Sequence, residues 1–322
     1  MLDLKLGANG LEPPIAVAYS GGADSTALLH LAARQWPGQV QAIHIHHGLQ
    51  AAADEFVQYC RGACAQLRVP LHVVHVQAKN AAGESPEDAA RRARYKALAA
   101  KVLELNQAIA GINTAQTAIK SVALAQHADD QVETLLLALS RGAGVAGLAG
   151  MPPHFERHGV QFVRPLLHLG AQDLRDWLNV QGIAYINDPT NADLAYTRNK
   201  IRHQLLPVLA EVFPQYRETF ARSARNMALA ADLLAQAAIK DIAIVGNPPR
   251  IAALQTLSAA AQGNVLRHWL KTEFGVAGSE AQISELLAQI ADCTNRGKNI
   301  RIKVASGYVQ RQGEVLHYLP SV

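Results

Sequence analysis

Short apolar runs alternate with helical patterns through the first two hundred residues of the chain. The apolar runs have the length and composition of buried strands and cover residues 15–20, 40–47, 71–77 and 121–127. The segments between them repeat apolar positions at helical spacing and cover residues 25–36, 55–68, 85–105 and 130–141. Continuously apolar strands that alternate with helices are typical of a parallel sheet covered on both faces. The pattern therefore predicts an α/β domain, with Ser85 as the cap of its third helix and with residues 106–120, which match neither period, as a loop or insertion.

The alternation stops near Tyr216, where an Ala- and Leu-rich helical pattern begins and continues to about residue 240. A break at 247–249 is followed by further helical patterns to about residue 291. Residues 300–304 and 308–319 then have the pattern of two hairpin strands, turning around Gly307 or around Gln312-Gly313. We therefore predict two domains, a catalytic domain over residues 1–215 and a smaller, mostly helical α+β domain over residues 216–322.

Composition excludes several classes of protein. Apolar residues make up 49% of the chain and charged residues 17%, which excludes an intrinsically disordered protein. No apolar run reaches the roughly 18 residues of a membrane span, and the first residues lack the pattern of a secretory signal. Three cysteines cannot frame a disulfide-based fold. We expect a cytoplasmic globular protein that has no membrane partner, and the sequence leaves a homodimer open.

Net charge is a modest +4, from 30 basic and 26 acidic residues, and does not by itself indicate a nucleic-acid partner. One segment is more basic than the rest, since Glu211 and Glu218 are outnumbered there by Arg198, Lys200, Arg202, Arg217, Arg222 and Arg225. Such a cluster forms either a solvated helix surface or a surface that contacts phosphates, and charge alone does not decide between them.

A glycine-rich turn after the first predicted strand carries the strongest local signal. Gly21 and Gly22 allow a tight turn and a close approach of the backbone to a ligand. The helix that follows the turn offers free N–H groups to an anion, and Ser20 and Ser25 add hydroxyl groups. A carboxylate at Asp24 repels phosphate unless a divalent cation lies between them, so the loop reads as a nucleotide and Mg²⁺ site. No Gly-Lys-Ser/Thr follows, which excludes a Walker A loop. The alternative to a nucleotide-binding loop is an ordinary turn between a strand and a capped helix.

A second group of polar residues follows the fourth predicted strand. His127 ends that strand at the edge where ligands bind in open parallel sheets, and Asp130 and Glu133 share one face of the next helix. Two carboxylates there suit a metal ion or a substrate ammonium group, although acidic residues also stabilise a helix N-terminus. The glycines at 142–147 fit the spacing of a dinucleotide-binding loop, but they follow a helix instead of a strand, so a dehydrogenase is not expected.

These motifs resemble two nested groups of proteins. The run from Ser20 to Ser25 resembles the pyrophosphate loop (PP-loop) of the ATP pyrophosphatase superfamily, whose members activate a carbonyl oxygen by adenylation. The stretch 125–153 closely resembles the signature of tRNA(Ile)-lysidine synthetases. Segments at 44–49, 90–95, 188–191 and 198–203 resemble further motifs of that family, in the same order, over residues 13–210. Gln50 and Gln126 depart from the family pattern, as does the 106–120 insertion.

The resemblance implies a Rossmann-like, adenine-nucleotide alpha-hydrolase-like fold and a specific reaction. Cofactors would be ATP and Mg²⁺, and the substrates free L-lysine and the isoleucine tRNA with a CAU anticodon. O2 of the first anticodon cytidine would be adenylated, and lysine would then displace AMP at C2 to give lysidine. This modification changes codon reading from AUG to AUA and charging from methionine to isoleucine. Alternatives are another adenylating tRNA-modifying enzyme of the superfamily and an inactive tRNA-binding paralogue, and Cys60 and Cys64, which do not form C-x-x-C, argue against a thiolating relative.

The resemblance also implies roles for individual residues. The PP-loop, Ser20, Gly21, Gly22, Ala23, Asp24 and Ser25, would hold ATP, with Mg²⁺ on Asp24 and Asp130. Lysine would be bound by Asp130 and Glu133 through an ammonium group and by Arg91 through its carboxylate. Either a nearby carboxylate or His127 would accept the proton of the attacking amine. The residues expected to contact tRNA are Arg141, Arg198, Asn199 and Arg202.

Overall fold

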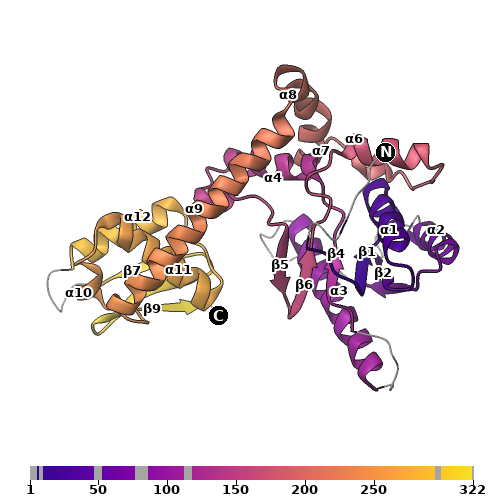
Figure 1. Cartoon of the computed structure of the whole chain (residues 1–322). Helices are drawn as coiled ribbons and strands as arrows, with labels where there is room; N and C mark the ends of the chain where they lie inside the picture. Colours follow the sequence, from indigo (N-terminus) through magenta and orange to yellow (C-terminus); the bar gives the residue numbers. More distant parts are fainter. Residues whose placement is uncertain are drawn as a thin grey trace. The chain divides into compact units, whose positions relative to one another are not determined.

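Two compact units make up the chain in the computed structural model, Met1–Arg225 and Asn226–Val322 (Figure 1). The residues that the structure describes are 6, 10–46, 53–76, 86–111, 118–293 and 299–320. The division falls within α9 (Tyr216–Val245), whereas the sequence placed the boundary at the start of this helix. Within the described ranges, no helix has both the length and the apolar character needed to cross a membrane.

A six-stranded sheet forms the centre of the first unit, in the order β3-β2-β1-β4-β6-β5. Its strands are β1 (Ile15–Ala18), β2 (Val40–His46), β3 (Leu71–His75), β4 (Ser121–Ala123), β5 (His154–Arg157) and β6 (Val160–Val163). All pair in parallel except β5, which lies antiparallel to β6 at one edge. The predicted α/β class with a mostly parallel sheet is confirmed.

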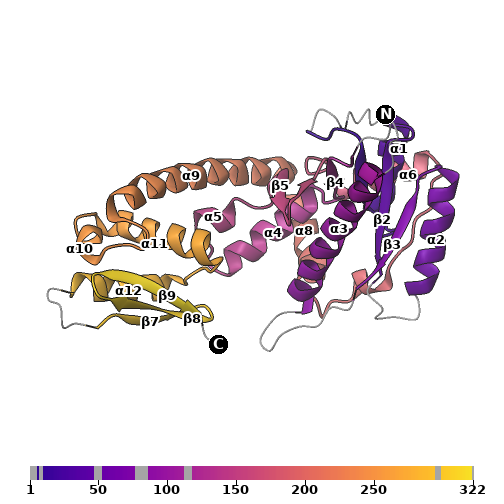
Figure 2. The same ribbon diagram turned by 90° about the horizontal axis from the view of Figure 1, so that it is seen from below.

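Helices cover both faces of this sheet (Figure 2). Successive residues of a strand point to opposite faces, so β1 contributes side chains to a core on each side. On one face, Val17 of β1 lies in a core with residues of α1 (Ala23–Gln35), α2 (Ala53–Gln66) and α6 (Ala171–Val180). On the other face, Ala16 packs with residues of α3 (Pro86–Gly111).

Residues 106–111, which the sequence assigned to a loop or insertion, continue α3 to Gly111, so a loop is wrong for these residues. Asn106 stabilises the end of the helix, because its side chain donates to the carbonyl of Ile119 at 3.0 Å and accepts from its N–H at 2.8 Å. A local pattern could not reveal this contact with the chain that leads into β4. Ser85, the predicted cap, and residues 112–117 lie outside the described residues.

A hairpin of β5 and β6 was not anticipated from the sequence. His158 and Gly159 form its turn, and both have positive φ angles of 53° and 73°, as a two-residue hairpin turn of type I′ requires. The fourth strand is shorter than predicted, ending at Ala123, and His127 caps a helix instead of ending the strand.

The remaining elements of the first unit follow β4 and β6. They are α4 (Ala128–Ser140), α5 (Val145–Leu148), a 3₁₀ turn at Pro189–Ala192, α7 (Thr197–Lys200), a π-helical turn at Ile201–Leu205 and α8 (Leu206–Val212). A small core of Val132, Ile201, Leu206 and Tyr216 holds this last run of helical turns against α4.

The second unit packs helices on a separate antiparallel sheet. Its elements after α9 are α10 (Ile251–Leu254), α11 (Ala259–Phe274), α12 (Glu280–Ala291), β7 (Arg301–Val304), β8 (Gly307–Gln312) and β9 (Val315–Pro320). The sheet has three strands instead of the predicted two, because the chain turns both before Gly307 and at Gly313. The predicted mostly helical α+β character is confirmed.

Candidate active site

The strand order reverses between β1 and β4, which lie side by side in the middle of the sheet. In open α/β sheets, ligands bind at the carboxyl ends of the strands at this switch point. The Ser20–Ser25 loop follows β1, and His127 follows β4. The fold therefore brings the two polar groups that the sequence singled out to one place.

The Ser20–Ser25 loop is held in shape by its own hydroxyl groups. Ser25 Oγ accepts from the N–H of Ser20 at 3.2 Å, donates to the carbonyl of Gly22 at 3.1 Å and lies 3.0 Å from Ser20 Oγ. Gly21 has a φ of +88°, and a Cβ there would lie 3.1 Å from Cys60 Sγ, so only glycine fits. Gly22 is the N-cap of α1 and offers no side-chain hydrogen bond, which leaves the N-terminus of this helix open to an anion.

Asp24, in the first turn of α1, has a carboxylate oxygen that a bound cation would stabilise. Its Oδ1 atom is buried and has no hydrogen-bond partner in the described part of the chain, and Oδ2 lies 3.5 Å from His127 Nε2. A buried carboxylate oxygen without a partner is costly unless a cation or a donor is supplied. No cluster of three or more candidate metal ligands was found among the described residues. Mg²⁺ is usually held by one or two carboxylates together with substrate phosphates, so Asp24 beside a phosphate loop fits this ion.

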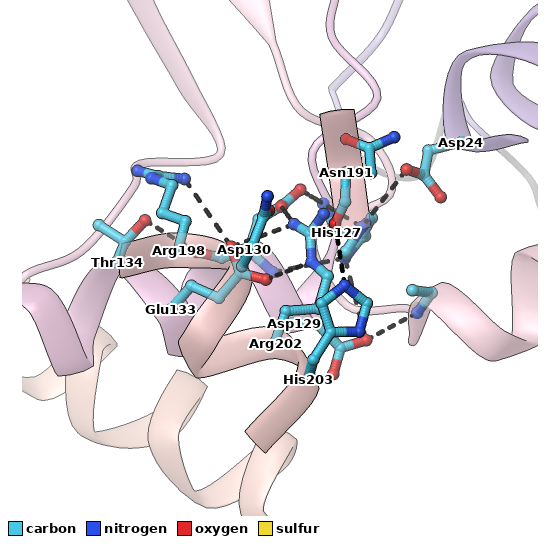
Figure 3. A network of polar contacts seen from close by, with 12 residues as sticks. Asp24, His127, Asp129, Asp130, Glu133, Thr134, Asn191, Arg198, Arg202 and His203 are labelled. Carbon is cyan, nitrogen blue, oxygen red and sulfur yellow. Dashed lines mark hydrogen bonds and ion pairs between the residues drawn. The ribbon is translucent and has the colours of Figure 1, made fainter. Parts of the chain in front are cut away.

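His127 fixes the start of α4 and joins the carboxylates around it (Figure 3). Its Nδ1 accepts from the N–H of Asp130 at 3.4 Å, while Asp130 Oδ2 accepts from the N–H of His127 at 3.1 Å. Its Nε2 lies 3.5 Å from both Asp24 Oδ2 and Asp130 Oδ2. Burial disfavours the imidazolium, but the carboxylates of Asp130, Asp24 and Asp129 outweigh it and raise the pKa of His127. The ring, only 3% exposed, therefore lies between the two proposed metal-binding carboxylates.

The acidic pair on α4, Asp130 and Glu133, forms ion pairs with arginines from the helical run 197–205. Arg202 donates to both oxygens of Glu133, from Nε at 2.7 Å and from Nη2 at 3.1 Å, and Nη2 also donates to Asp130 Oδ1 at 3.1 Å. Arg198 lies 3.9 Å from Glu133 (Figure 3). Burial raises the pKa of the fully buried Glu133 despite Arg202 beside it. Arg198 and Arg202, four positions apart, therefore both face Glu133.

The remaining residues predicted to bind a substrate differ in their exposure and contacts. Asn199 is buried, and its amide donates to the carbonyls of Thr190 and Asp193 at 2.9 and 2.8 Å, so it holds the 189–193 turn. Arg141 is exposed at the end of α4. Arg91 is exposed on α3 and pairs with Asp88 at 3.2 Å.

Asp129 joins three elements next to the site. Its buried carboxylate accepts from the N–H of Ala171 at 2.8 Å, from Tyr216 Oη at 2.8 Å and from Arg217 Nε at 2.6 Å. Burial opposes the charge, yet these donors hold the pKa of Asp129 below its usual value. The start of α9 and the start of α6 are therefore attached to the residue that precedes Asp130.

We expect Tyr216→Phe to lower the free energy of unfolding by about 1 to 2 kcal/mol, because a buried hydrogen bond to a charged carboxylate is lost without a change of shape. Urea unfolding of the parent and variant would measure the difference. Tyr196→Phe, at a tyrosine that is 55% exposed, is the matched control and should leave stability unchanged. Equal stability of all three proteins would show that the Tyr216 contact contributes nothing.

The glycine-rich stretch 142–150 is no dinucleotide-binding loop. It forms the short helix α5 and returns to Met151, whose backbone exchanges two hydrogen bonds with the Gln131 side chain at 2.7 and 3.1 Å. Gly150 has a φ of +65°, and a Cβ there would lie 2.9 Å from that side chain. Glycine is thus required for this loop to close on α4.

Arg164, at the carboxyl end of β6, lies at the same edge of the sheet and was missed in the sequence. It donates to Gln126 Oε1, to the carbonyl of Pro152 at 2.6 Å and to Tyr95 Oη at 3.4 Å. Only the unanticipated hairpin places it there. The signal that could have located it is the alternation in 160–163 after His158-Gly159.

Comparisons with known proteins agree with the two-part organisation. A family model described as a PP-loop domain matches residues 5–209. A second one, described as a TilS substrate binding domain, matches residues 250–317.

Curated relatives match across nearly the whole chain. A tRNA(Ile)-lysidine synthase of Polaromonas naphthalenivorans is 58% identical over 307 residues, which are 95% of this chain and 89% of that protein. One from Bordetella pertussis is 40% identical and covers 86% of each chain. One from Burkholderia pseudomallei is 38% identical over 90% of this chain, which spans 58% of that protein's length.

A solved structure shares the fold. It is the U34-tRNA thiolase NcsA of Methanococcus maripaludis with its [4Fe-4S] cluster, with a TM-score of 0.55, 14% sequence identity and coverage of 66% of this chain and 70% of that chain. At this identity, the likeness concerns the fold alone.

Proposed function

The chain belongs to the tRNA(Ile)-lysidine synthase family, and we propose from this that its site uses ATP to join free L-lysine to C2 of the first anticodon cytidine of an isoleucine tRNA with a CAU anticodon. The chain is an ATP-using carbon–nitrogen ligase that modifies tRNA. The observation that carries the detailed proposal is the meeting of the Ser20–Ser25 loop, Asp24, His127 and Asp130 at the switch point of the sheet.

The reaction takes place in two steps. Cytidine O2 attacks the α-phosphorus of ATP, a P–O bond forms, and pyrophosphate leaves with the bonding electrons. The ε-amine of lysine then attacks C2, the C–O bond to the adenylate breaks, and AMP leaves. The amine loses a proton in the second step, so a base must accept it.

The Ser20–Ser25 loop would hold the phosphates. Gly21 and Gly22 let the backbone approach them, and the open N-terminus of α1 offers N–H groups to their negative charge. Asp24 and Asp130 would hold Mg²⁺, which neutralises the charge that develops on the departing pyrophosphate. The orphaned Oδ1 of Asp24 supports this role, and the engaged oxygens of Asp130 keep further lone pairs for a ligand.

The contacts support a division of roles around α4. Asp130, with a side chain that is 16% exposed, can reach a ligand, whereas Glu133 is fully buried and holds Arg202. We therefore assign the lysine ammonium group to Asp130, and Glu133 to a positioning role through Arg202. His127 Nδ1 already accepts a hydrogen bond, which favours a carboxylate over His127 as the acceptor of the amine proton. Exposed Arg141 is available to tRNA phosphates.

Transfer of labelled lysine to a transcript of the isoleucine tRNA with a CAU anticodon, in the presence of ATP and Mg²⁺, tests the proposal. Label in this tRNA and not in elongator methionine tRNA would support both the reaction and the choice of tRNA. Pyrophosphate release that depends on tRNA, without transfer of label, would keep the adenylation step and reject lysine as the nucleophile. Neither signal from folded protein would leave a tRNA-binding role alone. A homodimer remains a separate prediction, which sedimentation would check.

A further inference from the structure

Arg164 is a buried cation that no carboxylate in the described part of the chain neutralises. It is 7% exposed, and its guanidinium stacks over the ring of Phe155 at 4.4 Å. Its three acceptors are neutral oxygens, those of Gln126, Pro152 and Tyr95. A buried charge is normally paired with an opposite charge, because neutral partners replace only part of its hydration.

Charges of both signs act on Arg164 from further away. Arg91 contributes a positive charge and Asp130 a negative one, and within the described part of the chain neither forms an ion pair with it. Burial accordingly lowers the pKa of Arg164, and Arg91 lowers it further. An anion placed against this guanidinium would be stabilised by a fixed, desolvated and already oriented donor.

Position in the sheet restricts which anion this can be. Arg164 follows β6, and the Ser20–Ser25 loop follows β1, with β4 between them. The phosphates of ATP are therefore assigned to one side of β4, and Arg164 lies on the other side. A phosphate in the tRNA backbone is too bulky to reach a side chain that is 93% buried, whereas a small carboxylate is not.

We propose that Arg164, held in place by Gln126 and Tyr95, binds the α-carboxylate of the free lysine substrate and thereby selects the amino acid over other primary amines. The inference rests on the proposed lysidine reaction. It assigns to Arg164 the contact that the family resemblance implied for Arg91, whose guanidinium is exposed and paired with Asp88. The ε-amino group of lysine would then lie at Asp130 and its α-carboxylate at Arg164, and the charges of these two residues act on each other.

The test compares two nucleophiles, lysine and cadaverine (1,5-diaminopentane), which has the same chain and amine but lacks the carboxylate. Mass spectrometry of the nucleosides gives kcat/KM for each nucleophile. In Arg164→Gln, the value for lysine should fall about 10- to 100-fold, as expected for a lost charge-assisted hydrogen bond, while the value for cadaverine stays nearly constant. Pyrophosphate release before lysine addition should also stay constant. If cadaverine gives no product with the parent protein, the KM for lysine is the readout instead. It should rise about 10- to 100-fold in Arg164→Gln with little change in kcat, and an unchanged KM would overturn the inference.

Gln126→Glu is a second variant that keeps Arg164 and the shape of its partner. The new carboxylate would neutralise the guanidinium, so discrimination against cadaverine should fall as in Arg164→Gln. Arg61→Gln is the matched control, because it removes the same charge from an exposed position on α2. This control should discriminate as the parent does.

Each outcome separates this inference from the function on which it rests. If the parent protein transfers no lysine, the proposed function fails first. If it does, and Arg164→Gln lowers both nucleophiles equally, Arg164 only supports the structure and the inference is wrong. A loss confined to pyrophosphate release would instead assign Arg164 to the nucleotide and would equally overturn the inference.

Discussion

Replacing Asp24 with asparagine is expected to abolish pyrophosphate release and lysidine formation while tRNA binding stays close to that of the parent protein. Asparagine preserves the shape of the side chain but removes the charge at the buried Oδ1 atom, which has no partner among the described residues. Loss of a metal ligand at the departing pyrophosphate should lower the rate at least about 100-fold. Pyrophosphate release at saturating ATP, and tRNA binding measured separately, would check the two halves of this prediction.

Asp232→Asn removes the same charge from an exposed position on α9 and is the matched control, which should turn over normally. Asp24 also lies 3.5 Å from His127 Nε2, so a structural effect must be separated from loss of a metal ligand. Titration with Mg²⁺ separates them, because a ligand role requires a higher Mg²⁺ concentration for any residual activity of the variant. Turnover at the parent rate and at the parent Mg²⁺ requirement would exclude Asp24 as a ligand.

The fold was predictable where elements are long and their periods regular. The runs at 15–20 and 40–47 gave β1 and β2, and the helical pattern from Tyr216 gave α9. The misses are short or depend on distant contacts. The β5–β6 hairpin has strands of four residues each, and β5 is only partly buried, so little apolar pattern marks it.

The candidate site was predictable in part, because the Ser20–Ser25 loop and His127 each have a local signal and the carboxyl ends of β1 and β4 meet. The partners of the acidic pair were not predictable. Arg202 and Glu133 are 69 positions apart, and the basic cluster around Arg202 fits a solvated or an RNA-binding surface equally well. Only the packing of the helical run on α4 turns Arg202 toward Glu133.

Arg202→Met is expected to lower the free energy of unfolding by about 3 kcal/mol, since it leaves the fully buried carboxylate of Glu133 without its main counter-charge. The loss should depend on pH. Burial already raises the pKa of Glu133, and removal of Arg202 raises it further. A carboxyl with a higher pKa in the folded than in the unfolded state makes stability fall as pH rises between the two values. Urea unfolding should therefore show a larger difference from the parent at pH 8 than at pH 5.

The double variant Glu133→Gln with Arg202→Met tells apart the two roles that Arg202 can have. Without the buried charge, the double variant should recover most of the lost stability, and Arg222→Met, at an exposed arginine of α9, should lose none. If Arg202 also contacts a tRNA phosphate, the double variant should still bind tRNA more weakly, with a salt slope smaller by about 0.7 to 0.9. Parental tRNA affinity and salt dependence would instead limit Arg202 to holding Glu133, and the helical run 197–205 would act on the reaction only through the position of α4.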